Sequence, residues 1–231
     1  MVILIITSCS AGKDDSIPIR ENSKIVEPSY YLEDHDLISQ LEITRKRSFQ
    51  DPRANAGTKV TYAFDLYVNA GKTYKDLRRF NYEKIKSILL SSNDIEWFFL
   101  SGGFGIIHAL ERARKYQATF NSTIAQKNNI PSTSSYWRNT LPLICDSVAT
   151  KFNPEWTYVF GSKDYTSFIR QTQFWKIKNS IRMFESTGQT GPLWLSPILN
   201  ELVNSILNQN LSDFNEKYPK FVKQQDKSGM G

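Results

Sequence analysis

The sequence predicts an α/β fold: a mainly parallel sheet of at least four strands with helices on both faces and an inserted basic helical layer. Two observations carry this prediction. Short apolar runs rich in β-branched or aromatic residues and bounded by turn formers are typical of buried strands, and segments with helical period separate them. Alternating strands and helices favour parallel crossover connections. The runs are residues 2–6, 96–100, 156–160 and 180–184.

Helical period is present in four segments. Apolar residues recur every three or four positions in residues 82–89, 141–148 and 168–172. The last helix has the strongest pattern, with Ser196 expected as its N-cap and Pro197 as its first residue. Its apolar face is predicted to comprise Ile198, Leu199, Leu202, Val203, Ile206 and Leu207.

Residues 16–81 form a segment that is too long for a simple crossover and that holds a dense set of basic residues. We interpret it as an inserted helical layer, with one helix over residues 31–49 and a second helix from near Thr61. Residues 1–223 are expected to form a single domain. Residues 224–231 are polar and are expected to be a frayed tail.

Composition narrows the class of protein. The 231 residues are 40% hydrophobic and 23% charged, which is typical of a globular domain. The net charge of +6 favours polyanionic partners such as nucleic acid. The chain has no apolar stretch approaching the roughly 20 residues of a membrane helix, so we expect no membrane association and a cytoplasmic location.

Cysteine and histidine usage predicts neither a disulfide nor a metal site. Cys9 lies in a small polar loop and Cys145 on the apolar face of a predicted helix, so we expect them to stay reduced. His35 and His108 do not have the spacing of metal ligands. We therefore expect no metal and no cofactor.

Each predicted strand runs into a small, polar or glycine-containing loop. These loops read TSCSAGKDD, SGGFG, GSKDY and ESTGQTG, and in a parallel sheet they meet at the carboxyl edge, where open α/β sheets bind ligands. We expect one shared pocket there, although small residues also serve simply to make tight turns. The first loop lacks the G-x-x-x-x-G-K-[ST] pattern, which argues against nucleotide triphosphate hydrolysis. The residues expected in one cavity are Ser10, Asp14, Ser101, Gly103 and Ser162.

Three segments resemble a known family. The Cys9, Ser10 and Lys13 loop, residues 65–79 and residues 99–116 are together similar to the YaaA family of peroxide-stress proteins. The similarity covers roughly the first half of the chain, and it departs at Phe104, where the family has tyrosine, and at Gly71, which is displaced. The wider group resembles uracil-DNA-glycosylase-like folds. The resemblance implies that the protein handles a nucleobase or nucleoside.

Cleavage of an N-glycosidic bond requires a carboxylate that stabilises the sugar cation or orients water, and donors that hold the departing base. Asp14 is the first candidate carboxylate and Glu111 the second, and His108 is the candidate donor. An aromatic side chain can stack on an extruded base, but it can equally be ordinary core packing. The predicted substrate-binding residues are Cys9, Ser10, Lys13, Tyr67, Ser101, Gly102, Gly103, Phe104, Tyr116, Ser162 and Lys163.

Basic residues of the inserted segment form the predicted phosphate-binding surface, with DNA as the expected partner. They are Arg45, Lys46, Arg47, Arg53, Lys72, Arg78 and Arg79. The leading hypothesis is a DNA base glycosylase that acts on a flipped, modified base in repair or in defence against phage. Two alternatives remain: a DNA-binding stress protein without catalysis, and a hydrolase of small nucleosides. The sequence indicates no obligate protein partner.

Overall fold

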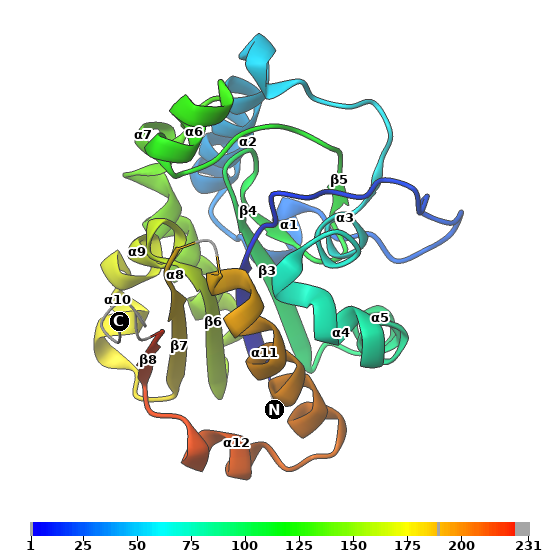
Figure 1. Cartoon of the computed structure of the whole chain (residues 1–231), viewed down its shortest axis with the longest axis vertical. Coiled ribbons are helices and arrows are strands. Elements are labelled where there is room, and N and C mark those ends of the chain that lie inside the picture. The colour runs from blue at the N-terminus through cyan, green and yellow to red at the C-terminus, as the bar shows by residue number, and fades with distance from the viewer. Residues whose placement is uncertain (1, 189, 225–231) are drawn as a thin grey trace, which may run out of the picture.

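A six-stranded, mostly parallel sheet forms the centre of the protein in the computed structural model, which describes residues 2–188 and 190–224 (Figure 1). The strand order is β4-β3-β1-β6-β7-β8, and only β4 runs antiparallel to its neighbour. The strands are β1 (Ile3–Ser8), β3 (Ile95–Ser101), β4 (Gly105–His108), β6 (Trp156–Ser162), β7 (Ile181–Ser186) and β8 (Phe221–Lys223). Two further short strands, β2 (Thr61–Tyr62) and β5 (Arg112–Ala113), pair with each other.

The predicted fold class is confirmed, and each of the four predicted strands coincides with a parallel strand of the sheet. β1 is central because all six of its residues are buried and it hydrogen-bonds to β3 on one side and to β6 on the other. Its continuous apolar run is the pattern expected of a strand covered on both faces.

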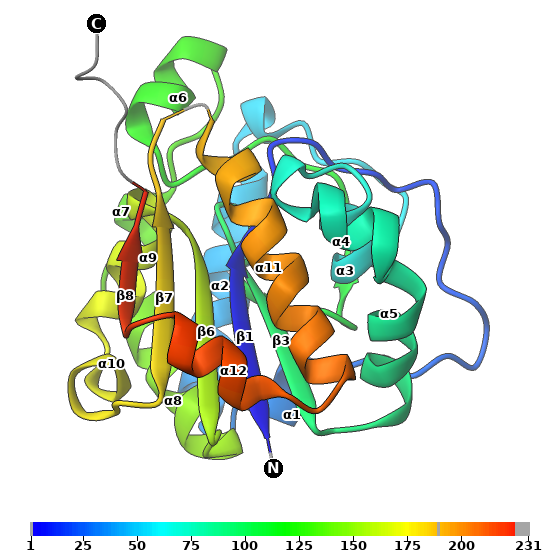
Figure 2. The same cartoon turned by 60° about the horizontal axis from the view of Figure 1, so that its bottom comes forward.

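Helices cover both faces of the sheet (Figure 2). Trp97 and Phe99 of β3 point to one face, where they pack on Phe64 and Tyr67, whereas Phe98 points to the other face and packs on Tyr31. The first face carries α3 (Ala63–Val68), η2 (Lys72–Tyr74), α4 (Lys75–Phe80), α5 (Tyr82–Ser91), α11 (Gly191–Leu207) and α12 (Leu211–Lys217). The second carries α1 (Pro28–Tyr31), α2 (His35–Gln50), α8 (Thr140–Phe152), α9 (Lys163–Gln171) and α10 (Gln173–Ile177).

The remaining helical turns lie beyond the carboxyl ends of the strands, at the top of Figure 1. They are η1 (Pro52–Ala54), α6 (Ser122–Asn128) and α7 (Ser134–Trp137).

The inserted segment differs in detail from its prediction. The helix expected over residues 31–49 is two helices, α1 and α2, because the chain is extended at Leu32 and Asp34 begins a new helix. The Asp34 carboxylate accepts hydrogen bonds from two backbone N–H groups of α2, which is the role of an N-cap. The helix expected near Thr61 begins at Ala63, after β2.

The predicted start of the last helix is wrong. α11 begins at Gly191, where Pro192 occupies the first turn, and it continues through Pro197. Ser196 is therefore an interior residue whose hydroxyl donates to the Asp76 carboxylate at 2.8 Å and accepts from the Asp76 N–H at 3.0 Å. The side chain that looked like a cap instead connects α11 to α4.

The end of the described chain belongs to the sheet. β8 pairs with β7, and the Gln224 N–H donates to the Glu185 carbonyl at 3.0 Å, so Gln224 is not part of a frayed tail. Residues 225–231 of the expected tail lie outside the described residues. Within residues 2–188 and 190–224, no helix has the length and apolar character needed to cross a membrane.

Candidate active site at the carboxyl edge

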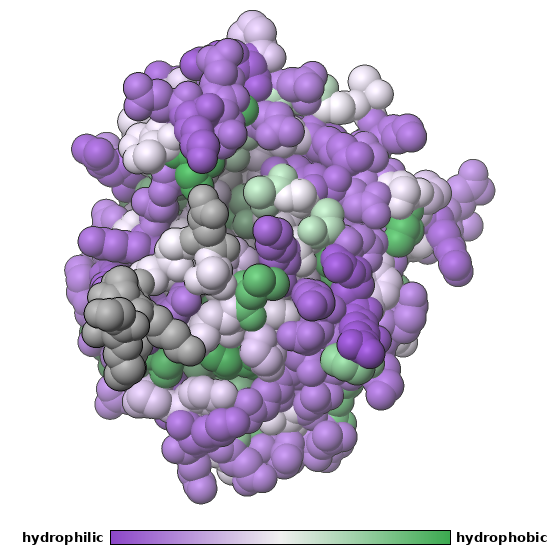
Figure 3. All heavy atoms as spheres, in the orientation of Figure 1, coloured by the Kyte–Doolittle hydropathy of each residue, from purple (hydrophilic) through white to green (hydrophobic). Residues whose placement is uncertain are grey.

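Four of the parallel strands, β1, β3, β6 and β7, end at one edge of the sheet, as the shared-pocket prediction requires. Ser8, Ser101, Ser162 and Ser186 are their last residues. The face shown in Figure 3 is hollowed at this edge, between α6 and the first turns of α11. The loops that follow these strands therefore lie at the same edge of the sheet.

A network of three buried hydroxyl groups lies at this edge. The Ser101 Oγ and the Tyr116 Oη are 2.6 Å apart, and the Tyr67 Oη lies 3.1 Å from the Tyr116 Oη. The Tyr67 hydroxyl donates to the Ser101 Oγ at 3.3 Å, and the Phe104 N–H donates to the same oxygen at 3.0 Å. Burial raises the pKa of Tyr67 and Tyr116, so both phenols stay protonated and able to donate hydrogen bonds.

Cys9 extends the polar cluster toward α9. Its N–H donates to the Leu100 carbonyl at 2.7 Å, which fixes the loop after β1 beside β3. Its thiol donates to the Tyr165 hydroxyl at 3.6 Å, and that hydroxyl lies 3.4 Å from the Thr119 Oγ1. The thiol thus lies within the hydroxyl cluster rather than in the apolar core.

Lys13 contributes an amine to the same place. Its Nζ lies 4.2 Å from the centre of the Tyr116 ring and donates to the Ser10 carbonyl at 3.2 Å. In the described part of the chain, no carboxylate lies within ion-pair distance of this amine. Burial lowers the pKa of Lys13, and the neighbouring Cys9 opposes this shift.

Two glycines of the SGGFG loop allow close packing around the tyrosines. A Cβ on Gly102 would lie 2.6 Å from the Ala118 carbonyl oxygen, and a Cβ on Gly103 would lie 2.8 Å from the Tyr116 ring. Phe104 packs edge-on against the Tyr116 ring, with 5.5 Å between the ring centres, and is buried. These residues therefore support the tyrosines and do not form a free stacking surface.

The loop residues Ser10, Ser162 and Lys163 lie at the same edge. The Ser10 hydroxyl donates to carbonyl groups of the loop and of α3, at 3.3 Å for Tyr67. Ser162 precedes the first residue of α9, Lys163, which is exposed.

Asp14 occupies a different environment from the cluster. Its carboxylate accepts the Ser16 N–H at 2.9 Å in a tight turn, and this hydrogen bonding lowers the pKa of Asp14. The Asp14 N–H donates to the Leu66 carbonyl at 2.9 Å. Asp14 therefore stabilises the loop that carries Lys13, and nothing in its contacts directs its carboxylate at the hydroxyl network.

Glu111 and His108 are buried, and their polar atoms contact other residues within the fold. The Glu111 carboxylate forms an ion pair with Arg45 and accepts hydrogen bonds from the Tyr31 hydroxyl at 3.0 Å and the His108 N–H at 3.2 Å. The Nδ1 of His108 accepts the Leu110 N–H, so the proton of the neutral ring resides on Nε2 and is donated to Glu96 at 2.9 Å. All of these polar groups have partners, which is typical of structural residues.

The predicted phosphate-binding residues separate into two groups. Arg45 points inward, where it contacts Glu111 and donates to the Phe104 and Ile106 carbonyls at 3.0 and 2.6 Å. The other six side chains are exposed: Lys46, Arg47, Arg53, Lys72, Arg78 and Arg79. Of these, Lys46 and Arg47 lie one turn before the carboxyl end of α2, where Phe49 packs on Tyr116.

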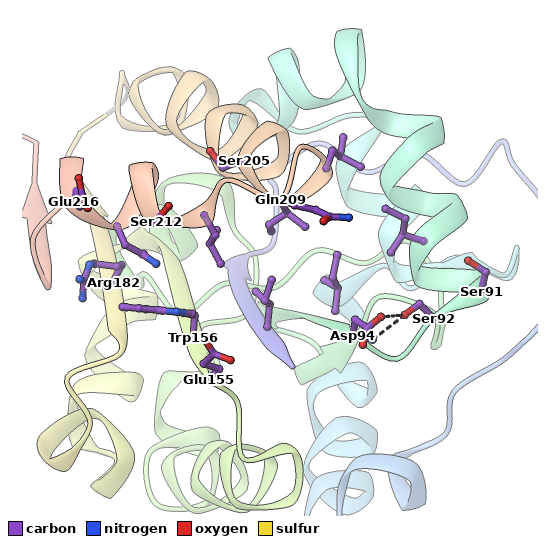
Figure 4. Close-up of a pocket in the computed structure, with 17 residues that line it drawn as sticks. Ser91, Ser92, Asp94, Glu155, Trp156, Arg182, Ser205, Gln209, Ser212 and Glu216 are labelled. Carbon is purple, nitrogen blue, oxygen red and sulfur yellow. Dashed lines mark hydrogen bonds between the residues drawn. The ribbon is translucent and has the colours of Figure 1, made fainter. Parts of the chain in front are cut away.

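A cavity of about 1080 Å³ lies at the opposite, amino edge of the sheet (Figure 4). Ile3, Ile95 and Trp156, which begin three strands, form part of its lining. Its carboxylates, such as Asp94, come from loops and helices, and Asp94 accepts a hydrogen bond from Ser92. We place the candidate active site at the carboxyl edge because the Lys13 amine and the hydroxyl network of Tyr67, Ser101 and Tyr116 are there.

Tyr165, like Thr119, belongs to the cluster although the sequence did not indicate it as a site residue. It is the third residue of α9, and the GSKDY loop, which ends on it, was the only signal in the sequence. In residues 2–188 and 190–224, no three His, Cys, Asp or Glu side chains are grouped so that they could hold a metal ion. No protein-family model matches the chain, and the comparison with curated proteins finds no match.

Proposed function

We propose that the protein is a nucleic-acid base glycosylase whose active site is the cluster at the carboxyl edge of the sheet. The observation that supports this proposal best is the position of the Lys13 amine, which has no carboxylate partner in the described part of the chain and lies against the ring of Tyr116, a member of the hydroxyl network with Tyr67 and Ser101. A departing base needs hydrogen-bond donors, and the Tyr67 and Tyr116 hydroxyls, whose pKa values are raised by burial, can donate. Such donors suit a polar, uncharged substrate group, and a nucleobase is one.

The exposed basic residues favour a polynucleotide over a free nucleoside. Lys46 and Arg47 lie at the same end of the molecule as the cluster, and Lys163 begins the helix that carries Tyr165. Cations placed around a pocket can hold the phosphates on either side of an extruded nucleotide. A hydrolase of small nucleosides would have no use for them.

The proposal is tested with oligonucleotide duplexes that carry single modified bases, including deaminated and oxidised ones, beside unmodified duplex. Base release is measured by mass spectrometry, and abasic sites are measured as strand breaks after alkali. We expect release from at least one modified duplex. Tyr116→Phe should lower the rate at least tenfold because it removes a donor from the network, and Tyr158→Phe is the matched control, since its hydroxyl contacts Asn215 at the other edge.

The DNA surface is tested separately by the salt dependence of binding. Lys46→Ala, Arg47→Ala and Lys163→Ala should each reduce the slope of log affinity against log salt concentration by roughly 0.9 for a lost phosphate contact. Salt-dependent binding without base release from any duplex would reject the glycosylase and favour a DNA-binding protein without catalysis. If these variants change neither the affinity for DNA nor the salt-dependence slope, DNA is not the partner of this surface.

A further inference from the structure

We propose that the Lys13 amine is the nucleophile of the reaction and forms a transient covalent iminium with C1′ of the sugar. This inference rests on the proposed function, since it assigns the reacting group in the same site. It replaces the mechanism expected from the sequence, in which a carboxylate such as Asp14 orients water. The structure leads away from that mechanism because the Asp14 carboxylate is held in its own turn by Ser16.

The surroundings of Lys13 are unusual for a lysine. Lysines are almost never buried unless they are paired with an acid. Lys115, two residues after Ala113 in the neighbouring loop, shows the ordinary arrangement, with its Nζ 2.8 Å from the Asp15 carboxylate and its side chain 44% exposed. Lys13 instead has the Ser10 carbonyl and the Tyr116 ring as its neighbours. Lys13 is partly buried, and an amine that is partly withdrawn from water without an acid partner among the described residues is a feature that a fold retains at a cost in stability.

This environment favours the form of the amine that reacts. Only the neutral amine has a lone pair with which to attack carbon. Burial lowers the pKa of Lys13, which increases the neutral fraction at any pH below the ordinary value. The face of an aromatic ring attracts the ammonium form weakly, but the contact is worth less than an ion pair with a carboxylate in a buried site.

The reaction balances with water as the only co-reactant. The Lys13 nitrogen forms a bond to C1′ while the bond from C1′ to the base breaks, and that electron pair leaves on the base nitrogen. The base takes up a proton from water, while the Tyr116 hydroxyl, held by Ser101, can donate a hydrogen bond to it. The amine loses a proton and the ring oxygen of the sugar gains one as the ring opens to the iminium. Water then releases the aldehyde sugar and restores the amine.

Cys9 is a second candidate nucleophile at this edge, but its contacts indicate a structural role. Its thiol donates to Tyr165 and its backbone is fixed to β3, so it holds the loop from which Lys13 extends. A thiol adduct at C1′ would also contain no nitrogen, so it could not open the sugar to an iminium.

The experiment uses the full chain and a duplex oligonucleotide with one abasic site, whose aldehyde reacts with an amine whatever base the enzyme recognises. Sodium borohydride reduces the iminium to a stable secondary amine, which is quantified on a denaturing gel and located by peptide mass spectrometry. We expect a one-to-one adduct at Lys13 that falls at least 100-fold in Lys13→Met and in Lys13→Arg. Lys115→Met, a neighbouring lysine with a carboxylate partner, should form the adduct at the wild-type level.

Two results overturn the inference: no adduct from the wild-type chain, or an adduct that persists in Lys13→Met. Circular dichroism and urea unfolding verify that the variants are folded, and Lys13→Arg provides a second variant that keeps the length and charge of the side chain. Base release from modified duplexes without an adduct would reject the covalent role of Lys13 but would still support the glycosylase proposal. An adduct without base release from any duplex would reject the glycosylase but leave the reactive amine.

Discussion

The buried ion pair between Arg45 and Glu111 should be essential for stability and dispensable for chemistry. The side chains are only 12% and 5% exposed, so solvent screens the pair weakly. Arg45→Met removes the charge that faces Glu111 and also the donors to the Phe104 and Ile106 carbonyls. An unpaired buried charge costs about 3–5 kcal/mol, and an unsatisfied carbonyl costs about 1 kcal/mol or more.

We therefore expect Arg45→Met to lower the free energy of unfolding by at least about 4 kcal/mol, which corresponds to a fall in Tm on the order of 10 °C. Urea unfolding at constant pH and salt measures the free energy. Lys46→Met is the matched control because Lys46 is the next residue of the same helix and is exposed, so its effect should stay within about 0.5 kcal/mol.

The double variant Arg45→Met with Glu111→Leu sharpens the test. Replacing both charges by apolar groups removes the unpaired carboxylate, so at least half of the lost stability should return. The reasoning fails if Arg45→Met costs less than about 1 kcal/mol, or if the double variant is as unstable as the sum of the two single variants.

Three further predictions concern the site. Asp14→Asn should leave base release within about threefold of the wild-type rate, measured at saturating duplex, because an amide oxygen can still accept the Ser16 N–H. Gly102→Ala should lower stability by about 1–3 kcal/mol in urea unfolding, since the new Cβ would lie 2.6 Å from the Ala118 carbonyl oxygen, which is backbone and cannot rotate away. Lys13→Met should stabilise the protein near pH 6, and this gain should shrink as the pH rises. Because the pKa of Lys13 is lowered in the folded protein, the unfolded chain binds the proton more tightly than the folded chain does. The stability of the wild-type protein therefore rises with pH until the lysine of the unfolded chain loses its proton near pH 10.4. Urea unfolding of both proteins across this range measures the difference, and a gain that does not change with pH would contradict the reasoning.

The parallel core was predictable because burial on both faces leaves a clear record in the sequence. β1, β3, β6 and β7 are apolar runs bounded by turns, and all four were found. β4 was not, since its Gly-Ile-Ile-His run follows β3 after three residues and could not be separated from the loop. Gly105 begins this strand with a φ of +69°, and the Trp137 ring occupies the place where a side chain would be.

The sequence pattern of the edge strand β8 is weaker than that of the core strands. Phe221 and Lys223 are exposed, and only Val222 between them is partly buried, so the apolar alternation of a half-buried strand is missing. The start of α11 was misplaced for a related reason: Pro192 and Pro197 both suit the first turn of a helix, and local sequence does not choose between them.

The location of the site followed from the strand ends, but the roles of its charged residues did not. Asp14 and Glu111 are both acids near glycine-rich loops, and their roles differ because their carboxylates have different hydrogen-bond and ion-pair partners. Glu111 contacts Arg45, which is 66 positions earlier in the chain, and such pairings depend on tertiary structure. A single sequence equally does not show that Lys13 lacks a carboxylate partner among the described residues, because this depends on which acidic side chains the fold places near it.

The central position of β1 bears on the order in which the chain can fold during synthesis. Its two neighbours in the sheet begin only at residues 95 and 156, so β1 is made long before either partner exists. At 5–20 residues per second, the delay before β6 emerges is roughly 10–30 s. Until β3 is made, β1 has no strand to pair with, and its other edge stays open until β6 emerges. Pairings across so many residues are also intrinsically slow to form. The nascent chain should therefore depend on chaperones that hold exposed apolar segments, and a chain truncated before β6 should aggregate.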